Sequence, residues 1–184
     1  MSIDFNATLQ FDVNLGDLDR ETGRLLARLT ASSAPFLRLT LWPEFDSFGT
    51  GDPGIQTGLD AWHMGSRNPD RWFRFAGEPN VLVDGSTQSW EEDGDFVTHF
   101  EVTASWRTAA SVVVAIAVLL AAAELGRGTF DANIEQVSDG QATSPADLVE
   151  RLRLTEPRGD FEEAARVLLS RTPGFAAWSA LSTS

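Results

Sequence analysis

The most apolar stretch of the chain is TAASVVVAIAVLLAAAEL, at 108–125. Wound into a helix, this stretch is apolar on every side, and such a helix has to be buried. Its uncharged part, 108–123, is shorter than the roughly 20 residues that a membrane span needs, and no basic cluster beside it would orient a span. The pattern therefore predicts a buried central helix over 108–125, ended by Gly126 in the left-handed conformation that often follows a helix.

Strands are predicted where apolar and polar residues alternate. These segments are 9–15, 36–42, 71–75, 81–83 and 96–106, with a short further strand over 129–134. Asp84-Gly85 is predicted to be a turn that ends the fourth segment. The Gly-, Pro- and Asp-rich segment 43–70 has no sustained period and is predicted to be a long loop. Short links between the middle strands favour antiparallel pairing.

Further helices are predicted by apolar faces and by start signals. An apolar face beginning at Leu18 predicts a helix up to about Thr30. The segment SPAD at 144–147 combines a serine cap, a first-turn proline and an acidic residue. Asp160 and Glu163 repeat the cap before a helical pattern, so two helices are expected late in the chain.

The order of these elements favours an α+β fold. We expect a mainly antiparallel sheet packed against a long buried central helix, at about 108–125, with two further C-terminal helices. The 184 residues are the length of one domain. The chain is therefore predicted to be a single α+β domain over 1–184, with 144–184 as its helical C-terminal part.

The charge of the chain narrows the classes of partner. There are 27 acidic and 14 basic residues, a net charge of −13, and every basic residue is an arginine. Phosphate contacts need a basic face, so a nucleic-acid partner is not expected, and the same charge disfavours docking on an anionic membrane. The excess charge indicates solubility and attraction to a basic protein partner.

The compartment is inferred from cysteine and from the first residues. The chain has no cysteine, which excludes disulfides and thiolate chemistry. The N-terminal sequence MSIDFNATLQ lacks the basic and apolar regions of a signal peptide, so we expect a cytoplasmic protein. The arginine-only, alanine-rich composition is typical of a GC-rich bacterial genome.

Motifs for cofactors and metals lack the context that their chemistry needs. GTGDPG at 49–54 matches the glycine pattern of dinucleotide-binding loops, but Pro53 removes an N–H donor and Asp52 repels phosphate. His63 has no second histidine at a metal-ligand spacing, and the acidic run 91–95 lacks the EF-hand spacing. We therefore predict no cofactor and no bound metal.

The aromatic residues and the acidic run are the candidates for partner binding. Six tryptophans and no tyrosine are present, and Trp and Arg are enriched at interface hot spots. The candidate partner-binding residues are Trp62, His63, Trp72, Arg74, Trp90, Glu91, Glu92, Asp93 and Asp95. Alternatively, the tryptophans pack on the sheet and the acidic run is a solvated hairpin tip. Trp42 and Trp106, at strand ends, and Trp178 are interpreted as structural.

One part of the chain resembles a known family. Residues 106–152 run from a strand end through the alanine-rich helix and Gly126 to Phe130-Asp131, and then to the segment SPADL at 144–148. This arrangement resembles small bacterial α+β immunity proteins of polymorphic toxin systems. The resemblance covers about a quarter of the chain, rests on topology and spacing, and carries over no functional residue. It implies a cytoplasmic protein that binds and blocks a toxin domain; acidic members often face basic nucleases.

Three functions remain open at this point. The preferred one is a non-enzymatic protein-binding module, an acidic immunity or inhibitor-type protein that blocks a basic toxin or enzyme. The second is an acidic nucleic-acid mimic that blocks a DNA-binding protein, against which the mixing of arginines through the chain counts. The third is a small enzyme using His63 or His99 with carboxylates of the 43–70 loop. His99 and Glu101, which share a strand face, are interpreted as a surface polar pair.

Overall fold

The computed structural model describes residues 3–32, 34–44, 47–65, 68, 70–78, 80–92, 95–130 and 144–175. The strands are β1 (Ile3–Leu9), β2 (Val13–Asn14), β3 (Leu37–Trp42), β4 (His63–Met64), β5 (Arg71–Gly77), β6 (Val81–Glu92), β7 (Asp95–Ala104) and β8 (Thr129–Phe130). The helices are α1 (Leu15–Thr30), α2 (Ala109–Leu125), α4 (Pro145–Leu152) and α5 (Phe161–Ser170), with 3-10 turns η2 (Leu59–Ala61) and η4 (Pro173–Phe175).

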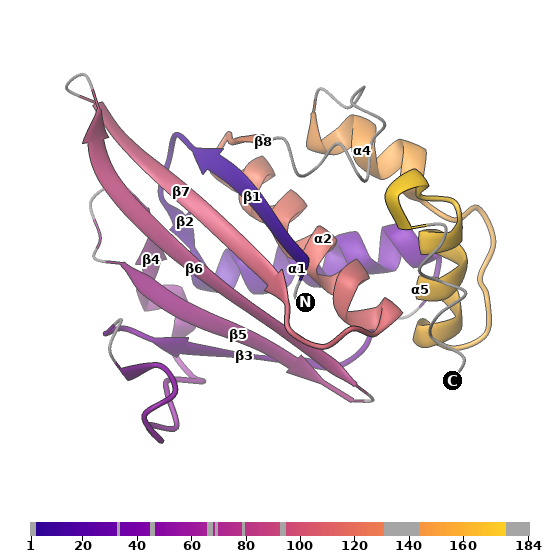
Figure 1. Ribbon diagram of the computed structural model, residues 1–184, viewed down its shortest axis with the longest axis horizontal. Helices are drawn as coiled ribbons and strands as arrows, with labels where there is room; N and C mark the ends of the chain where they lie inside the picture. The colour runs from indigo at the N-terminus through magenta and orange to yellow at the C-terminus, as the bar shows by residue number, and fades with distance from the viewer. Residues whose placement is uncertain are drawn as a thin grey trace.

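Six of the strands form one antiparallel sheet in the order β3-β5-β6-β7-β1-β8, and β2 and β4 form a separate pair. The long strands β6 and β7 make a hairpin that projects beyond the other strands (Figure 1). The described α-helices, α1, α2, α4 and α5, lie on one side of the six-stranded sheet (Figure 1). The structure confirms the predicted α+β fold, with its antiparallel sheet, central helix and two C-terminal helices.

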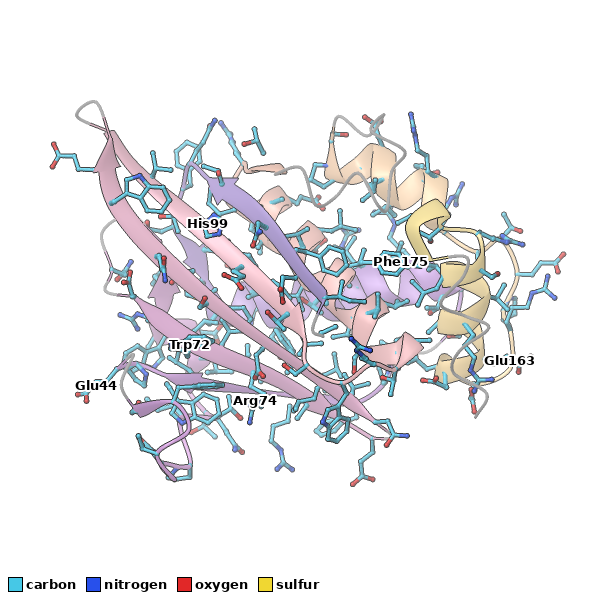
Figure 2. The ribbon with its side chains drawn as sticks, in the orientation of Figure 1. Glu44, Trp72, Arg74, His99, Glu163 and Phe175 are labelled. Carbon is cyan, nitrogen blue, oxygen red and sulfur yellow. The ribbon has the colours of Figure 1, made fainter. Side chains whose placement is uncertain are left out.

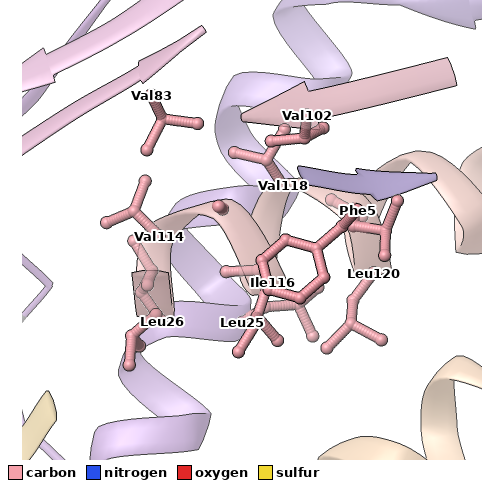
Figure 3. Packing of buried hydrophobic residues seen from close by; sticks show 14 of the residues in the cluster. Phe5, Leu25, Leu26, Val83, Val102, Val114, Ile116, Val118 and Leu120 are labelled. Atoms are coloured by element: carbon pink, nitrogen blue, oxygen red, sulfur yellow. The ribbon is translucent and has the colours of Figure 1, made fainter. Parts of the chain in front are cut away.

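The central helix α2 is buried on every side. Each residue over 109–123 is at most 2% exposed. The helix contacts β1, β6 and β7 of the sheet, and it contacts α1, α4 and α5 away from the sheet. Figure 3 shows Val83 and Val102 of the sheet beside α2 and Leu25 of α1 on its other side. An all-apolar helix thus finds apolar neighbours in every direction, as the sequence predicted.

The two ends of α2 are set by different interactions. At the start, the Thr108 hydroxyl accepts a hydrogen bond from the N–H of Ser111 at 3.1 Å. At the end, the predicted left-handed conformation of Gly126 is wrong: its φ is −88°, and Arg127 takes the left-handed conformation with φ 47°. Gly126 instead allows a close approach, because a Cβ there would lie 3.2 Å from the side chain of Leu9.

The predicted continuous strand over 9–15 is wrong, because only Leu9 at the end of β1 and the short β2 are strand within it. β1 ends at Leu9, and the next two N–H groups donate to the carbonyl of Gly126, at 3.0 and 3.1 Å, in place of a strand partner. Asn14 then caps α1 by accepting the N–H of Asp17 at 3.1 Å. A tertiary contact and a local cap therefore override the alternating pattern.

The predicted turn at Asp84-Gly85 is also wrong, because β6 continues through both residues. Gly85 pairs with Phe73 of β5, and a Cβ at Gly85 would overlap the Phe73 ring. That ring also stacks on Phe100 of β7, with centroids 5.5 Å apart. Glycine therefore makes room for an aromatic ring here and does not mark a turn.

Phe175, in η4, packs against the sheet. Phe175 is 2% exposed, and its ring centroid lies 6.2 Å from that of Phe5, between the sheet and the helices (Figure 2). Trp178 and residues 131–134 lie outside the described residues. In the described part of the chain, no helix has the length and apolarity needed to cross a bilayer.

The packing at Gly85 gives a stability test. Gly85→Ala is expected to destabilise the protein by about 1–3 kcal/mol in urea denaturation, because the added methyl overpacks the Phe73 ring. The control is Gly23→Ala in α1, where no atom lies within 4 Å of the Cβ position. That control is expected to stabilise by about 0.5–1 kcal/mol through helix propensity. An unchanged stability for Gly85→Ala would contradict this packing.

Candidate protein-binding surface

The side of the sheet away from the helices is the open face. Its side chains alternate with the buried ones along each strand. From the outer strand β3 inwards, they belong to Arg38, Thr40, Trp42, Trp72, Arg74, Ala76, Leu82, Asp84, Ser86, Gln88, Trp90, Val97, His99, Glu101, Thr103, Asp4, Asn6 and Thr8. Three of the predicted residues, Trp72, Arg74 and Trp90, lie on this face.

The centre of the open face is polar and internally paired. Two guanidinium nitrogens of Arg74 donate to the carboxylate of Asp84. The Nε–Oδ1 distance is 2.5 Å and the Nη2–Oδ2 distance is 3.1 Å. The hydroxyl of Ser105 donates to the same carboxylate at 2.6 Å, and Thr103 donates to Asp4 at 2.8 Å. Arg74 is therefore already satisfied within the protein. These two carboxylates are engaged, so they do not form the row of free carboxylates that a nucleic-acid mimic would need.

One corner of the open face is covered by the loop after β3. Phe48 stacks on Trp72 at a centroid distance of 4.6 Å and meets Trp42 edge-on at 5.2 Å. Trp42 is 7% exposed and donates its indole N–H to the carbonyl of Asp52 at 2.9 Å. Trp42 is thus structural, as predicted. Trp72 is half-buried beneath residues of its own chain.

The glycines of the GTGDPG segment shape this covering loop. Gly49, Gly51 and Gly54 have φ values of 81°, 92° and 67°. The carboxylate of Asp52 accepts the N–H of Gly54 at 2.9 Å, as in an Asx turn. The segment that matches a dinucleotide-binding pattern is therefore a cluster of turns over an aromatic corner.

The projecting hairpin carries Trp90 and the acidic run. Trp90 is 44% exposed, and Glu91 is exposed beside it. Successive side chains of a strand point to opposite faces, so Trp90 and Glu91 face different ways. The backbones of Glu92 and Asp95 form the last pair of the β6–β7 ladder, and Asp93 lies outside the described residues.

Trp62 and His63 lie away from the open face, at the start of α1. The carbonyl of Trp62 accepts a hydrogen bond from the N–H of Leu15 at 3.0 Å. The guanidinium of Arg71 lies over the half-buried Trp62 ring, 4.8 Å from the ring centroid. Burial lowers the pKa of Arg71. His63 is exposed, with Nε2 3.4 Å from Nδ2 of Asn14. The predicted residues therefore fall into two groups, and only the open-face group adjoins the hairpin.

A hollow at the other end of the open face was missed by the sequence. Phe36, Arg38, Leu82 and Trp106 line a space of about 380 Å³. Phe36 is 81% exposed and Trp106 is 45% exposed. Trp106, which was interpreted as structural, lies past the end of β7 and borders the hollow. Aromatic residues just outside strand ends, such as these two, were the signal available in the sequence.

The two histidines belong to different sheets. His99 is half-buried on the open face, with its ring centroid 6.3 Å from that of Trp90, whereas His63 is in β4. Glu101 shares the open face with His99. Among the residues that the structure describes, no group of three or more His, Cys, Asp or Glu side chains is arranged to hold a metal ion.

Comparisons with protein-family models, curated proteins and solved structures found no match for this chain. The open face, with the hairpin at one end and the hollow at the other, is the candidate functional surface.

The paired centre of the open face can be tested by substitution. Asp84→Ala is expected to destabilise the protein by about 1–3 kcal/mol, because it leaves the half-buried Arg74 guanidinium unpaired. The matched control is Asp17→Ala, which removes the partner of Arg20 in a pair whose side chains are 52% and 63% exposed. That change is expected to cost at most about 1 kcal/mol. Equal losses in urea denaturation would contradict the structural role of the Arg74–Asp84 pair.

Proposed function

We propose that this chain is a non-enzymatic protein-binding module, a cytoplasmic inhibitor or immunity-type protein that binds and blocks a basic protein. The observation that supports the proposal is the position of the exposed large hydrophobic side chains. Among the described residues there are five such side chains, and three of them, Phe36, Trp90 and Trp106, border the open face. Phe36 and Trp106 lie together at one end of this face and Trp90 lies at the other, and Trp is enriched at interface hot spots.

The polar centre between these aromatic residues also suits an interface. Burying an unpaired charge is costly, whereas a charge that already has its partner can be covered at much lower cost. The Arg74–Asp84 pair with Ser105 meets that condition. A partner can therefore cover the centre while it contacts the aromatic residues at both ends.

The net charge supports a basic partner. At −13, the protein attracts a positively charged surface over long range and repels acidic ones. Such attraction raises the association rate and weakens as salt is added. In Figure 1 the β6–β7 hairpin projects beyond the rest of the sheet, so Glu91, which is exposed near its end, would meet an approaching partner early.

Binding is tested with the purified products of the two genes that flank the gene of this chain, by calorimetry at low salt. We expect a complex with one basic product, weakened by about 1–4 kcal/mol in Trp90→Ala and in Trp106→Ala. The control Phe11→Ala removes an aromatic side chain, 52% exposed, beside the end of α2. It is expected to change the binding free energy by less than about 0.5 kcal/mol. If neither product binds at low salt, the proposed function is wrong.

The contribution of the acidic hairpin is tested through the association rate. The variant with Glu91→Gln, Glu92→Gln, Asp93→Asn and Asp95→Asn is expected to associate about tenfold more slowly in stopped-flow measurements at low salt. The control neutralises four acids on the helical side by Glu124→Gln, Glu150→Gln, Glu156→Gln and Glu163→Gln, and so changes the net charge equally. Equal slowing by both sets would mean that net charge alone acts and that the hairpin has no special part.

A further inference from the structure

The outer edge of β3 leaves backbone hydrogen-bonding groups unpaired. β3 is the first strand in the sheet order, with β5 on its inner side. At Leu41, both the N–H and the C=O bond to Ile55 on the outer side, at 2.8 Å each. Backbone groups of alternate residues point to the same side of an antiparallel strand, so those of Leu39 and Leu37 also face outwards. Within the described part of the chain, no backbone partner reaches them.

Ile55 demonstrates that this edge accepts an antiparallel segment. The chain does not extend that segment, because it departs at Gly58, whose φ of 68° leads into η2. In Figure 1 the loop that follows β3 gathers at the arrowhead of the strand, and the beginning of β3 lies at the lower border of the sheet. Among the described residues, the edge is therefore occupied at Leu41 and open at Leu37 and Leu39.

The hollow lies directly beside the open part of this edge. Arg38, between the two outward-facing residues, projects onto the open face and lines the hollow, and Phe36 precedes the strand there. Side chains of neighbouring strands that lie opposite one another share a face of the sheet. A residue placed opposite Arg38 on an added strand would therefore lie next to Arg38 on the open face, at the border of the hollow, and a large side chain there can reach into it.

We infer that an extended segment of the basic partner adds to the edge of β3 at 37–39 and places one apolar side chain in the hollow. The inference rests on the proposed function and specifies how the basic partner contacts this chain. Strand addition of this kind draws affinity from main-chain hydrogen bonds and specificity from pockets for alternate side chains. Residues 43–60, which continue from β3 to Ile55 and beyond, include four acids and no basic residue. Asp60 is paired with Arg20 and Asp52 accepts the N–H of Gly54, so the net charge of −13 is what favours arginine or lysine in the added segment.

A second copy of this chain is a poorer occupant of the same edge. Each copy has a net charge of −13, so two copies repel one another. Pairing of two β3 edges would also bring two acidic 43–60 segments to one interface. A basic segment avoids both repulsions, so the charge of the chain favours a strand from a different, basic protein.

Amide hydrogen exchange of the free protein and of its complex tests the inference. The amides of Arg38 and Thr40, which point towards β5, are expected to exchange slowly in both states and serve as internal controls. Those of Leu37 and Leu39 are expected to exchange fast in the free protein and at least about tenfold more slowly in the complex. A complex that leaves both of these amides unprotected overturns the inference and leaves the proposed function standing.

A proline variant provides the second measurement. Leu37 is the first residue of β3, a position where proline is tolerated, and its N–H faces outwards. Leu37→Pro is expected to weaken partner binding about tenfold while Arg38 and Thr40 stay protected. Unchanged affinity overturns the inference, as does a concentration-dependent dimer of the free protein that protects Leu37 and Leu39. Failure of any complex to form contradicts the proposed function and the inference together.

Discussion

A helix without a polar face has to be surrounded, and α2 imposes that requirement on the rest of the chain. The sheet covers one side through β1, β6 and β7, and α1, α4 and α5 cover the others. The buried residues of α1, α4 and α5 belong to the same hydrophobic cluster as those of α2. Water against any part of 109–123 would forfeit burial energy of about 25 cal/mol per Å². The layered arrangement follows from this one constraint.

The same constraint explains why the open face exists. Among the residues that the structure describes, α1, α4 and α5 gather around α2, and no described helix covers the other side of the sheet (Figure 1). The sheet meets water there with a paired polar centre, Arg74 and Asp84, and a loop shields the aromatic corner at Trp72. Aromatic residues stay exposed at the hairpin and around the hollow. Packing around α2 does not explain why they are there.

Several details were decided by close approach between elements. Gly85 sits within a strand because the Phe73 ring lies over it, and Gly126 admits the side chain of Leu9. In both places local sequence rules favour a different structure, a turn at one and a left-handed cap at the other. The neighbouring chain, distant in sequence, changes which conformation is lowest in free energy, and no local pattern reports that neighbour.

The sequence by itself determined the fold class, the buried helix and the helix caps at Ser144 and Asp160, because periodicity and capping act over a few residues. It also identified Trp90 and the acidic hairpin as candidates. Only the tertiary structure decided which candidates share a surface. It tied Arg74 to Asp84, separated Trp62 from the open face, and joined residues 36 and 106 around one hollow. These outcomes depend on strand order and register, which arise from long-range pairing that no stretch of sequence contains.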